Sequence, residues 1–110
     1  MDRTITPQDL KIALAEGAGP VLLDVRRTED RTKAPVGIPG ATWKDPATLA
    51  DWGPGLDSGH EVVLYCVRGG SVSNAVLDDL LARGLRARYI EGGLEAWQAA
   101  GGATEPQVQP

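Results

Sequence analysis

Short apolar runs alternate with helical patterns along the whole chain, and Gly- or Pro-containing turns separate them. The clearest run, Val62–Tyr65, leads directly into a Gly-rich segment and then into a helical pattern with apolar residues on one side. A second run, Val21–Val25, follows a helical pattern over residues 7–17 that Thr6 can cap. Such alternation is typical of α/β proteins in which helices cover both faces of a mainly parallel sheet. The sequence therefore predicts a three-layer α/β fold.

The other elements are short. We expect residues 26–34 to form a solvated loop or one helical turn, and residues 103–110 to form a loose tail. The 110 residues are enough for one domain, 1–110, whose core spans about residues 5–102. The remaining elements are expected as strands at 41–43 and 88–90, a brief helix at 45–52 ended by Gly53, and a short helix carrying Leu94 and Trp97.

Composition and charge exclude several classes of function. The net charge of −4 argues against binding to nucleic acid, which depends on Lys and Arg that neutralise phosphates. No apolar run approaches the roughly 20 residues of a membrane-spanning helix, and no signal peptide is evident, so we expect a cytoplasmic protein. A single Cys cannot form an internal disulfide or a four-thiolate metal site, so we expect no metal and a free thiol.

That single cysteine, Cys66, follows the clearest strand at a junction between strand and helix. Ligands of open α/β sheets bind outside the carboxyl ends of the strands. Gly69 and Gly70 let the backbone N–H groups turn inward, and such a loop binds anions and stabilises a thiolate. A buried, inert Cys is the alternative, but Ser71 and Ser73 at the helix start favour a functional anion loop.

Four motifs make the chain resemble a single rhodanese domain. They are VLLDVR at residues 21–26, IPGA at 38–41, Tyr65-Cys66 at the strand end, and EGGLEAW at 91–97. The match covers about residues 5 to 102. Within the family, CVRGGSVS after Trp43-Lys44-Asp45-Pro46 is most similar to rhodaneses of chromate-resistance operons.

The resemblance implies a five-stranded, mainly parallel sheet and a sulfurtransferase without a cofactor. Sulfane sulfur would pass from thiosulfate or a similar small-molecule donor, through a persulfide on Cys66, to a thiol or cyanide acceptor. Asp24 and Arg26 would support the site, most simply as a structural ion pair that fixes neighbouring loops. The oligomeric state stays open. The residues expected to bind the substrate are those of the loop: Val67, Arg68, Gly69, Gly70, Ser71 and Val72.

Two departures from the family pattern bear on the chemistry. Ser71 stands where a frequent family loop has Arg, and Gly37 stands where His often precedes the IPGA turn. The loop Cys66 to Val72 is also one residue longer than usual, like the loop of related phosphatases and arsenate reductases. Those enzymes need Arg where Val72 stands, to clamp an oxyanion bidentately. An oxyanion hydrolase or reductase and a non-catalytic binding module are therefore the rival interpretations.

A Cys-His hydrolase is excluded by distance. His60 is the only imidazole, and an extended strand places it about 20 Å from Cys66, at about 3.3 Å per residue. We expect His60 in an exposed turn. Arg68 is expected to hold the anionic end of thiosulfate, with a solvated side chain as the alternative.

Overall fold

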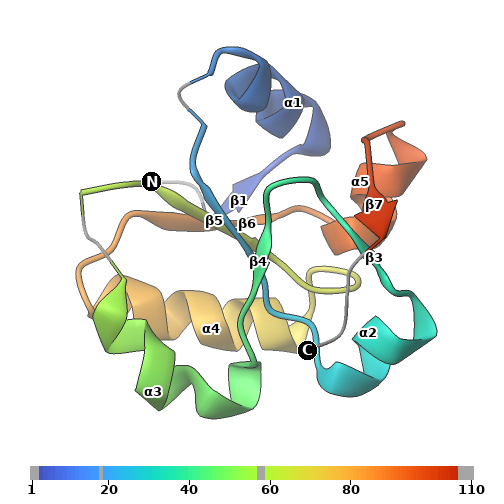
Figure 1. Cartoon of the computed structure of the whole chain (residues 1–110). Coiled ribbons are helices and arrows are strands. Elements are labelled where there is room, and N and C mark those ends of the chain that lie inside the picture. The colour runs from blue at the N-terminus through green and yellow to red at the C-terminus, as the bar shows by residue number, and fades with distance from the viewer. Residues whose placement is uncertain (1–2, 18, 57–58, 107–110) are drawn as a thin grey trace.

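Five parallel strands form the central sheet of the computed structural model, which describes residues 3–17, 19–56 and 59–106. Their spatial order is β1-β6-β5-β2-β4, and β5 lies at the centre (Figure 1). The predicted α/β fold with a five-stranded parallel sheet is confirmed. The strands are β1 (Thr4–Ile5), β2 (Val21–Asp24), β4 (Thr42–Trp43), β5 (Val62–Tyr65) and β6 (Ala87–Ile90).

Strand β5 is buried along its full length, because β2 and β6 pair with its two edges and both faces of the sheet are covered. Side chains alternate between the two faces of a strand. Val62 and Leu64 accordingly belong to one buried cluster, whereas Val63 and Tyr65 belong to the other. This alternation puts the next residue, Cys66, on the face of Val62 and Leu64.

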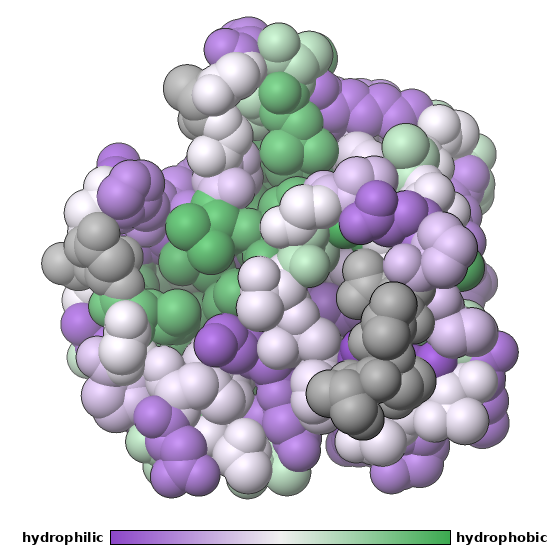
Figure 2. All heavy atoms as spheres, in the orientation of Figure 1, coloured by the Kyte–Doolittle hydropathy of each residue, from purple (hydrophilic) through white to green (hydrophobic). Residues whose placement is uncertain are grey.

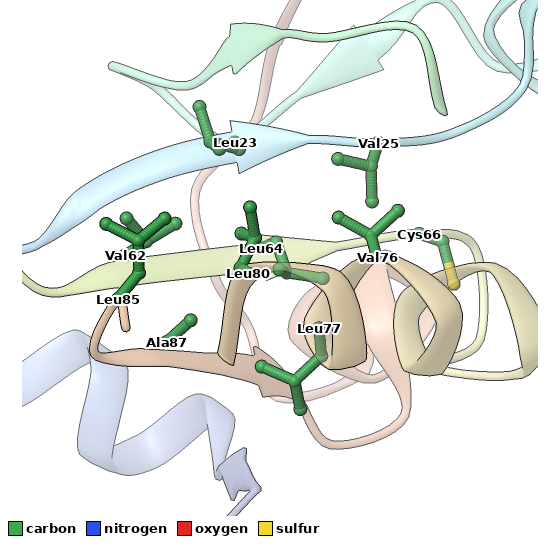
Figure 3. Packing of buried hydrophobic residues seen from close by; sticks show 10 residues of the cluster. All are labelled: Leu23, Val25, Val62, Leu64, Cys66, Val76, Leu77, Leu80, Leu85 and Ala87. Carbon is green, nitrogen blue, oxygen red and sulfur yellow. The ribbon is translucent and has the colours of Figure 1, made fainter. Parts of the chain in front are cut away.

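Helices cover both faces of the sheet (Figure 1). On one face, α4 (Ser71–Ala82) packs Val76, Leu77 and Leu80 onto the sheet (Figure 3). Leu49 and Trp52 of α3 (Leu49–Trp52) pack against the same cluster. We call this the α4 face. On the other face, α1 (Pro7–Ala15) contributes Leu10, and α5 (Gly93–Ala99) contributes Leu94 and Trp97. We call this the α5 face.

The segment after β2 is more ordered than the sequence predicts. Residues 28–33 form helix α2 (Thr28–Lys33), because Arg31 is buried against the ring of Trp43, with its guanidinium carbon 4.3 Å from the ring centroid. The expected helix at 45–52 divides into the 3₁₀ turn η1 (Pro46–Thr48) and α3. Gly53 does not end the helical path, because the 3₁₀ turn η2 (Gly53–Gly55) continues it.

The expected loose tail is partly wrong. Glu105 and Pro106 form β7 (Glu105–Pro106), which pairs antiparallel with β3 (Val36–Gly37). The chain reaches this position because the Trp97 side chain donates a hydrogen bond of 2.8 Å to the carbonyl of Ala103. The rest of the predicted tail, residues 107–110, lies outside the described residues.

The sheet edge at β4 covers only part of β2. Strand β4 pairs with Leu23 and Asp24, and Val21 at the start of β2 remains 41% exposed. The face shown in Figure 2 carries hydrophobic atoms (green) towards its middle left, with hydrophilic residues (purple) around them. Helices α2 and α5 lie beside the carboxyl ends of the strands, where Cys66 follows β5 (Figure 1).

Candidate active site

Cys66 lies directly after β5, at the carboxyl end of the central strand. Its side chain is 6% exposed and lies on the α4 face beside Val76 (Figure 3). Its Sγ accepts a hydrogen bond of 2.9 Å from Ser73 Oγ. The thiol is therefore covered by the first turns of α4, and its sulfur has one hydroxyl donor.

The sequence pointed to Ser73 as part of the helix start that favours an anion loop, but not to its direct contact with the sulfur. Ser73 is fully buried, in the first turn of α4. Val76 and Leu77, which lie three and four residues further on, face the same core. The contact could have been predicted from the sequence, because Ser73 lies on the inward side of a predicted amphipathic helix close to Cys66. A buried hydroxyl needs a hydrogen-bond partner.

Glycines shape the loop between Cys66 and α4. Gly69 has a φ of +71°, which favours glycine, and an added Cβ would lie 3.1 Å from the Gly92 backbone nitrogen. Gly70 precedes α4, and no side chain caps the first turn of that helix. Ser71 and Val72 occupy this first turn, whose N–H groups have no partner within the helix. Free N–H groups at a helix start are donors of the kind that bind anions, and substrate binding by this loop stays a prediction.

Helix α5 holds the same loop from the other face. The N–H of Leu94 donates to the Cys66 carbonyl at 2.9 Å, and the N–H of Glu95 donates to the Val67 carbonyl at 3.0 Å. A Cβ on Gly93 would lie 2.6 Å from the Cys66 carbonyl oxygen, so only glycine permits this approach. The pair Gly92-Gly93 at the start of α5 thus fixes the position of the cysteine loop.

Arg68 lies away from the sulfur. Its Nε donates to Glu95 Oε2 at 3.1 Å, and its side chain is 80% exposed. With Val67 and Leu94 it lines a cleft of about 330 Å³, which we call the α5-side cleft. The structure therefore brings Cys66 together with Ser73 and the start of α4, whereas the Arg68 side chain contacts Glu95 of α5.

A larger cleft of about 560 Å³ lies on the α4 face, and we call it the α4-side cleft. Val72 and Val76, which pack in the same buried cluster as Cys66, form part of its wall. Its charged lining residues are Arg27 and Glu29 near the start of α2, and Asp45 before η1. Sequence analysis missed Arg27 and Glu29 because they occur within a charged segment that reads as solvated.

Asp24 and Arg26 form the buried ion pair that sequence analysis favoured. Nε and Nη2 of Arg26 contact both carboxylate oxygens of Asp24, at 2.9 to 3.1 Å. The guanidinium also donates to the carbonyls of Ala34 and Val36. This pair fixes the segment between α2 and β3 to the end of β2, and so supports the rim of the site.

Tyr65, the residue before Cys66, is held in place by a buried hydrogen bond. Its hydroxyl accepts the N–H of Ile38 at 3.2 Å. Burial, followed by the nearby negative charge of Asp24, raises the pKa of the Tyr65 phenol far above its ordinary value. The phenol is therefore neutral across the physiological pH range and fixes the end of β5.

Two absences hold for the residues that the structure describes. Among residues 3–17, 19–56 and 59–106, no group of three His, Cys, Asp or Glu side chains is arranged to hold a metal ion. No helix in the same ranges is long and apolar enough to cross a membrane.

His60 is exposed and precedes β5, at the opposite end of the strand from Cys66, as predicted.

Comparison with known proteins identifies the family. Residues 6–100 match the model of the rhodanese-like domain. No curated protein matches the chain in sequence.

Solved structures agree with this match. A rhodanese-like domain protein from Staphylococcus aureus is 30% identical, with a TM-score of 0.77, over 87% of this chain and 91% of its own. A full-length protein from Lactobacillus plantarum is 27% identical, with a TM-score of 0.83, over 94% and 88% of the two chains. A Rhodopseudomonas palustris protein described as a possible tyrosine phosphatase is 27% identical, with a TM-score of 0.79, over 94% and 84%.

Proposed function

The chain belongs to the rhodanese-like domain family, and on that premise we propose that it is a sulfurtransferase whose Cys66 carries sulfane sulfur as a persulfide. The observation that carries the proposal is the position of the Cys66 Sγ. It lies at the carboxyl end of the central strand, beside an uncapped helix start, and accepts the Ser73 hydroxyl at 2.9 Å. This arrangement suits a thiolate nucleophile.

In the first half-reaction, the Cys66 thiolate attacks the outer sulfur of thiosulfate or a similar donor. The S–S bond of the donor breaks and sulfite leaves with the bonding electron pair. The backbone N–H groups of Val67 to Ser71 would hold the negative charge during this step. The persulfide formed on Cys66 needs no metal or organic cofactor.

In the second half-reaction, an acceptor thiolate or cyanide attacks the terminal sulfur of the persulfide. The Cys66 sulfur is then the leaving group. A hydroxyl that donates to this sulfur stabilises the thiolate that forms. Ser73 therefore supports the departure of Cys66 and restores the state in which the next donor binds.

The role expected for Arg68 stays a prediction. To hold the sulfonate end of thiosulfate, its guanidinium would exchange Glu95 for the donor. Arg68→Ala should then raise the KM for thiosulfate, whereas an unchanged kcat/KM would assign the residue to the surface. The proposed similarity to rhodaneses of chromate-resistance operons, and a cytoplasmic location, likewise stay predictions.

Intact-mass spectrometry after incubation with thiosulfate tests the proposal. The wild type should gain one sulfur atom, and a thiol or cyanide should remove it again. Cys66→Ser should gain none while it keeps its fold, because Ser is nearly isosteric and cannot store sulfane sulfur. An unmodified wild type, or equal thiocyanate production by Cys66→Ser, would refute the proposal.

A further inference from the structure

Glu95, in the first turn of α5, contacts the cysteine loop twice. Its backbone N–H donates to the Val67 carbonyl at 3.0 Å, and its carboxylate oxygen Oε2 accepts the Nε–H of Arg68 at 3.1 Å. The neighbouring Leu94 N–H donates to the Cys66 carbonyl at 2.9 Å. The Glu95–Arg68 ion pair therefore joins two backbone segments that hydrogen bonds already hold against each other.

This ion pair directs Arg68 away from the sulfur. The Cys66 side chain packs in the cluster of the α4 face, whereas Arg68 lines the α5-side cleft with Leu94 and Lys33. Glu95 engages only the Nε of Arg68, and within the described part of the chain the two Nη groups have no hydrogen-bond partner. The guanidinium therefore keeps donors free for an anion, but its side chain lies on the α5 side.

The strength of the Glu95–Arg68 pair is modest. Both side chains are largely exposed, so water and salt weaken the attraction between their charges. An anion that binds at the loop can therefore displace the Glu95 carboxylate from Arg68. The displacement still weakens the binding of that anion, because the ion pair is lost.

The charge of Arg68 matters because the other groups of the loop are neutral. Backbone N–H groups and the Ser73 hydroxyl donate hydrogen bonds but carry no net charge. Coulomb attraction to a cation grows in proportion to the charge of the ligand. While Arg68 is paired with Glu95, the two charges offset each other, and the loop distinguishes poorly between a monoanion and a dianion.

We propose that Glu95 is a specificity-determining residue, which competes with the sulfur donor for Arg68 and so lowers the preference of the site for dianionic donors. The inference rests on the proposed persulfide chemistry at Cys66. Glu95 acts through Arg68 and is a positioning residue. Loss of its carboxylate leaves the Arg68 guanidinium free to bind the anionic end of the donor.

Two donors with the same chemistry and different charges test this inference: thiosulfate, a dianion, and benzenethiosulfonate, a monoanion. In each reaction the Cys66 thiolate attacks the outer sulfur, the S–S bond of the donor breaks, and sulfite or benzenesulfinate leaves with the electron pair. Intact-mass time courses give the second-order rate constant of sulfur gain. Glu95→Gln should raise this constant about threefold for thiosulfate, in keeping with an exposed ion pair. The rise for benzenethiosulfonate should be only about 1.7-fold, because its charge is half as large.

The double variant Arg68→Ala/Glu95→Gln shows whether Glu95 acts through Arg68. Its rate constants should equal those of Arg68→Ala alone for both donors. If Glu95→Gln accelerates sulfur gain equally in the Arg68→Ala background, the carboxylate acts on the donor directly and the inference is wrong. An equal rise for both donors, or no rise for either, would overturn it as well.

Glu61→Gln is the matched control. Glu61 forms an ion pair of 3.2 Å with Arg88, and it precedes β5 at the opposite end of the strand from Cys66. This variant removes the same charge from the protein and should leave both rate constants unchanged. A rise as large as that of Glu95→Gln would indicate a general effect of net charge and overturn the inference. Failure of the wild type to gain sulfur from either donor would instead refute the proposed function itself.

Discussion

Ser73 Oγ donates a hydrogen bond of 2.9 Å to Cys66 Sγ from the first turn of α4. The two residues are seven positions apart in the chain, and Ser73 has no exposed surface. The bond joins Cys66, the proposed nucleophile at the end of β5, to the helix that covers it. It therefore couples the chemistry of the site to the packing of α4 on the sheet.

Replacement of Ser73 by Ala should slow both half-reactions about tenfold, which corresponds to the loss of one hydrogen bond to a charged group. Ser73→Thr keeps a hydroxyl and should retain most of the activity. Stopped time courses of sulfur gain and loss by intact mass measure the two steps separately. Equal rates for wild type and Ser73→Ala would show that the bond is only structural.

Gly93→Ala should destabilise the protein by about 3 kcal/mol, because its Cβ would overlap the loop backbone and its φ is +66°. Gly40→Ala is the matched control. Gly40 also has a positive φ, +87°, but an added Cβ meets nothing within 4 Å, so only the dihedral cost of about 1–2 kcal/mol remains. Urea unfolding of both variants measures the difference. Equal losses would mean that α5 does not pack tightly on the loop.

Tyr65→Phe should lower the free energy of unfolding at pH 7 by about 1 kcal/mol, because the Ile38 N–H loses its acceptor. The folded pKa of Tyr65 is raised, so its contribution is complete below the ordinary tyrosine pKa of about 10 and is lost as pH rises beyond it. The stability advantage of the wild type should therefore shrink above pH 10 or so. Urea unfolding across this range tests the prediction, which a constant difference would contradict.

Val72→Arg should distinguish the sulfurtransferase from the rival oxyanion enzyme. A phosphoryl transition state spreads negative charge over three equatorial oxygens. Backbone N–H groups alone do not stabilise all of this charge. We expect no hydrolysis of an aryl phosphate by the wild type, and any gain only in Val72→Arg. Wild-type turnover that disappears in Cys66→Ser would instead favour the phosphatase chemistry suggested for the similar Rhodopseudomonas palustris protein.

The order of the longer helices and strands and the position of Cys66 followed from the sequence, whereas the two-residue strands β1, β3 and β7 did not. The run Val62–Tyr65 is short and carries apolar side chains on both faces, which indicates a central buried strand. The residue after such a strand lies at the ligand-binding edge of the sheet. Gly69 and Gly70 likewise indicated the anion loop, because their backbone freedom is a local property. These features depend on neighbouring residues in the chain, which a pattern records.

The tertiary structure decided which distant residues surround the sulfur. Strand alternation directs Cys66 to the α4 face, whereas Arg68 turns to Glu95 on α5, although only one residue separates them in the chain. Arg27 and Ser71, more than 40 positions apart in the chain, line the α4-side cleft together, because the start of α2 and the start of α4 lie on either side of it. The sequence predicts that a charged segment is solvated, because local composition carries no information on which distant segment will pack opposite it.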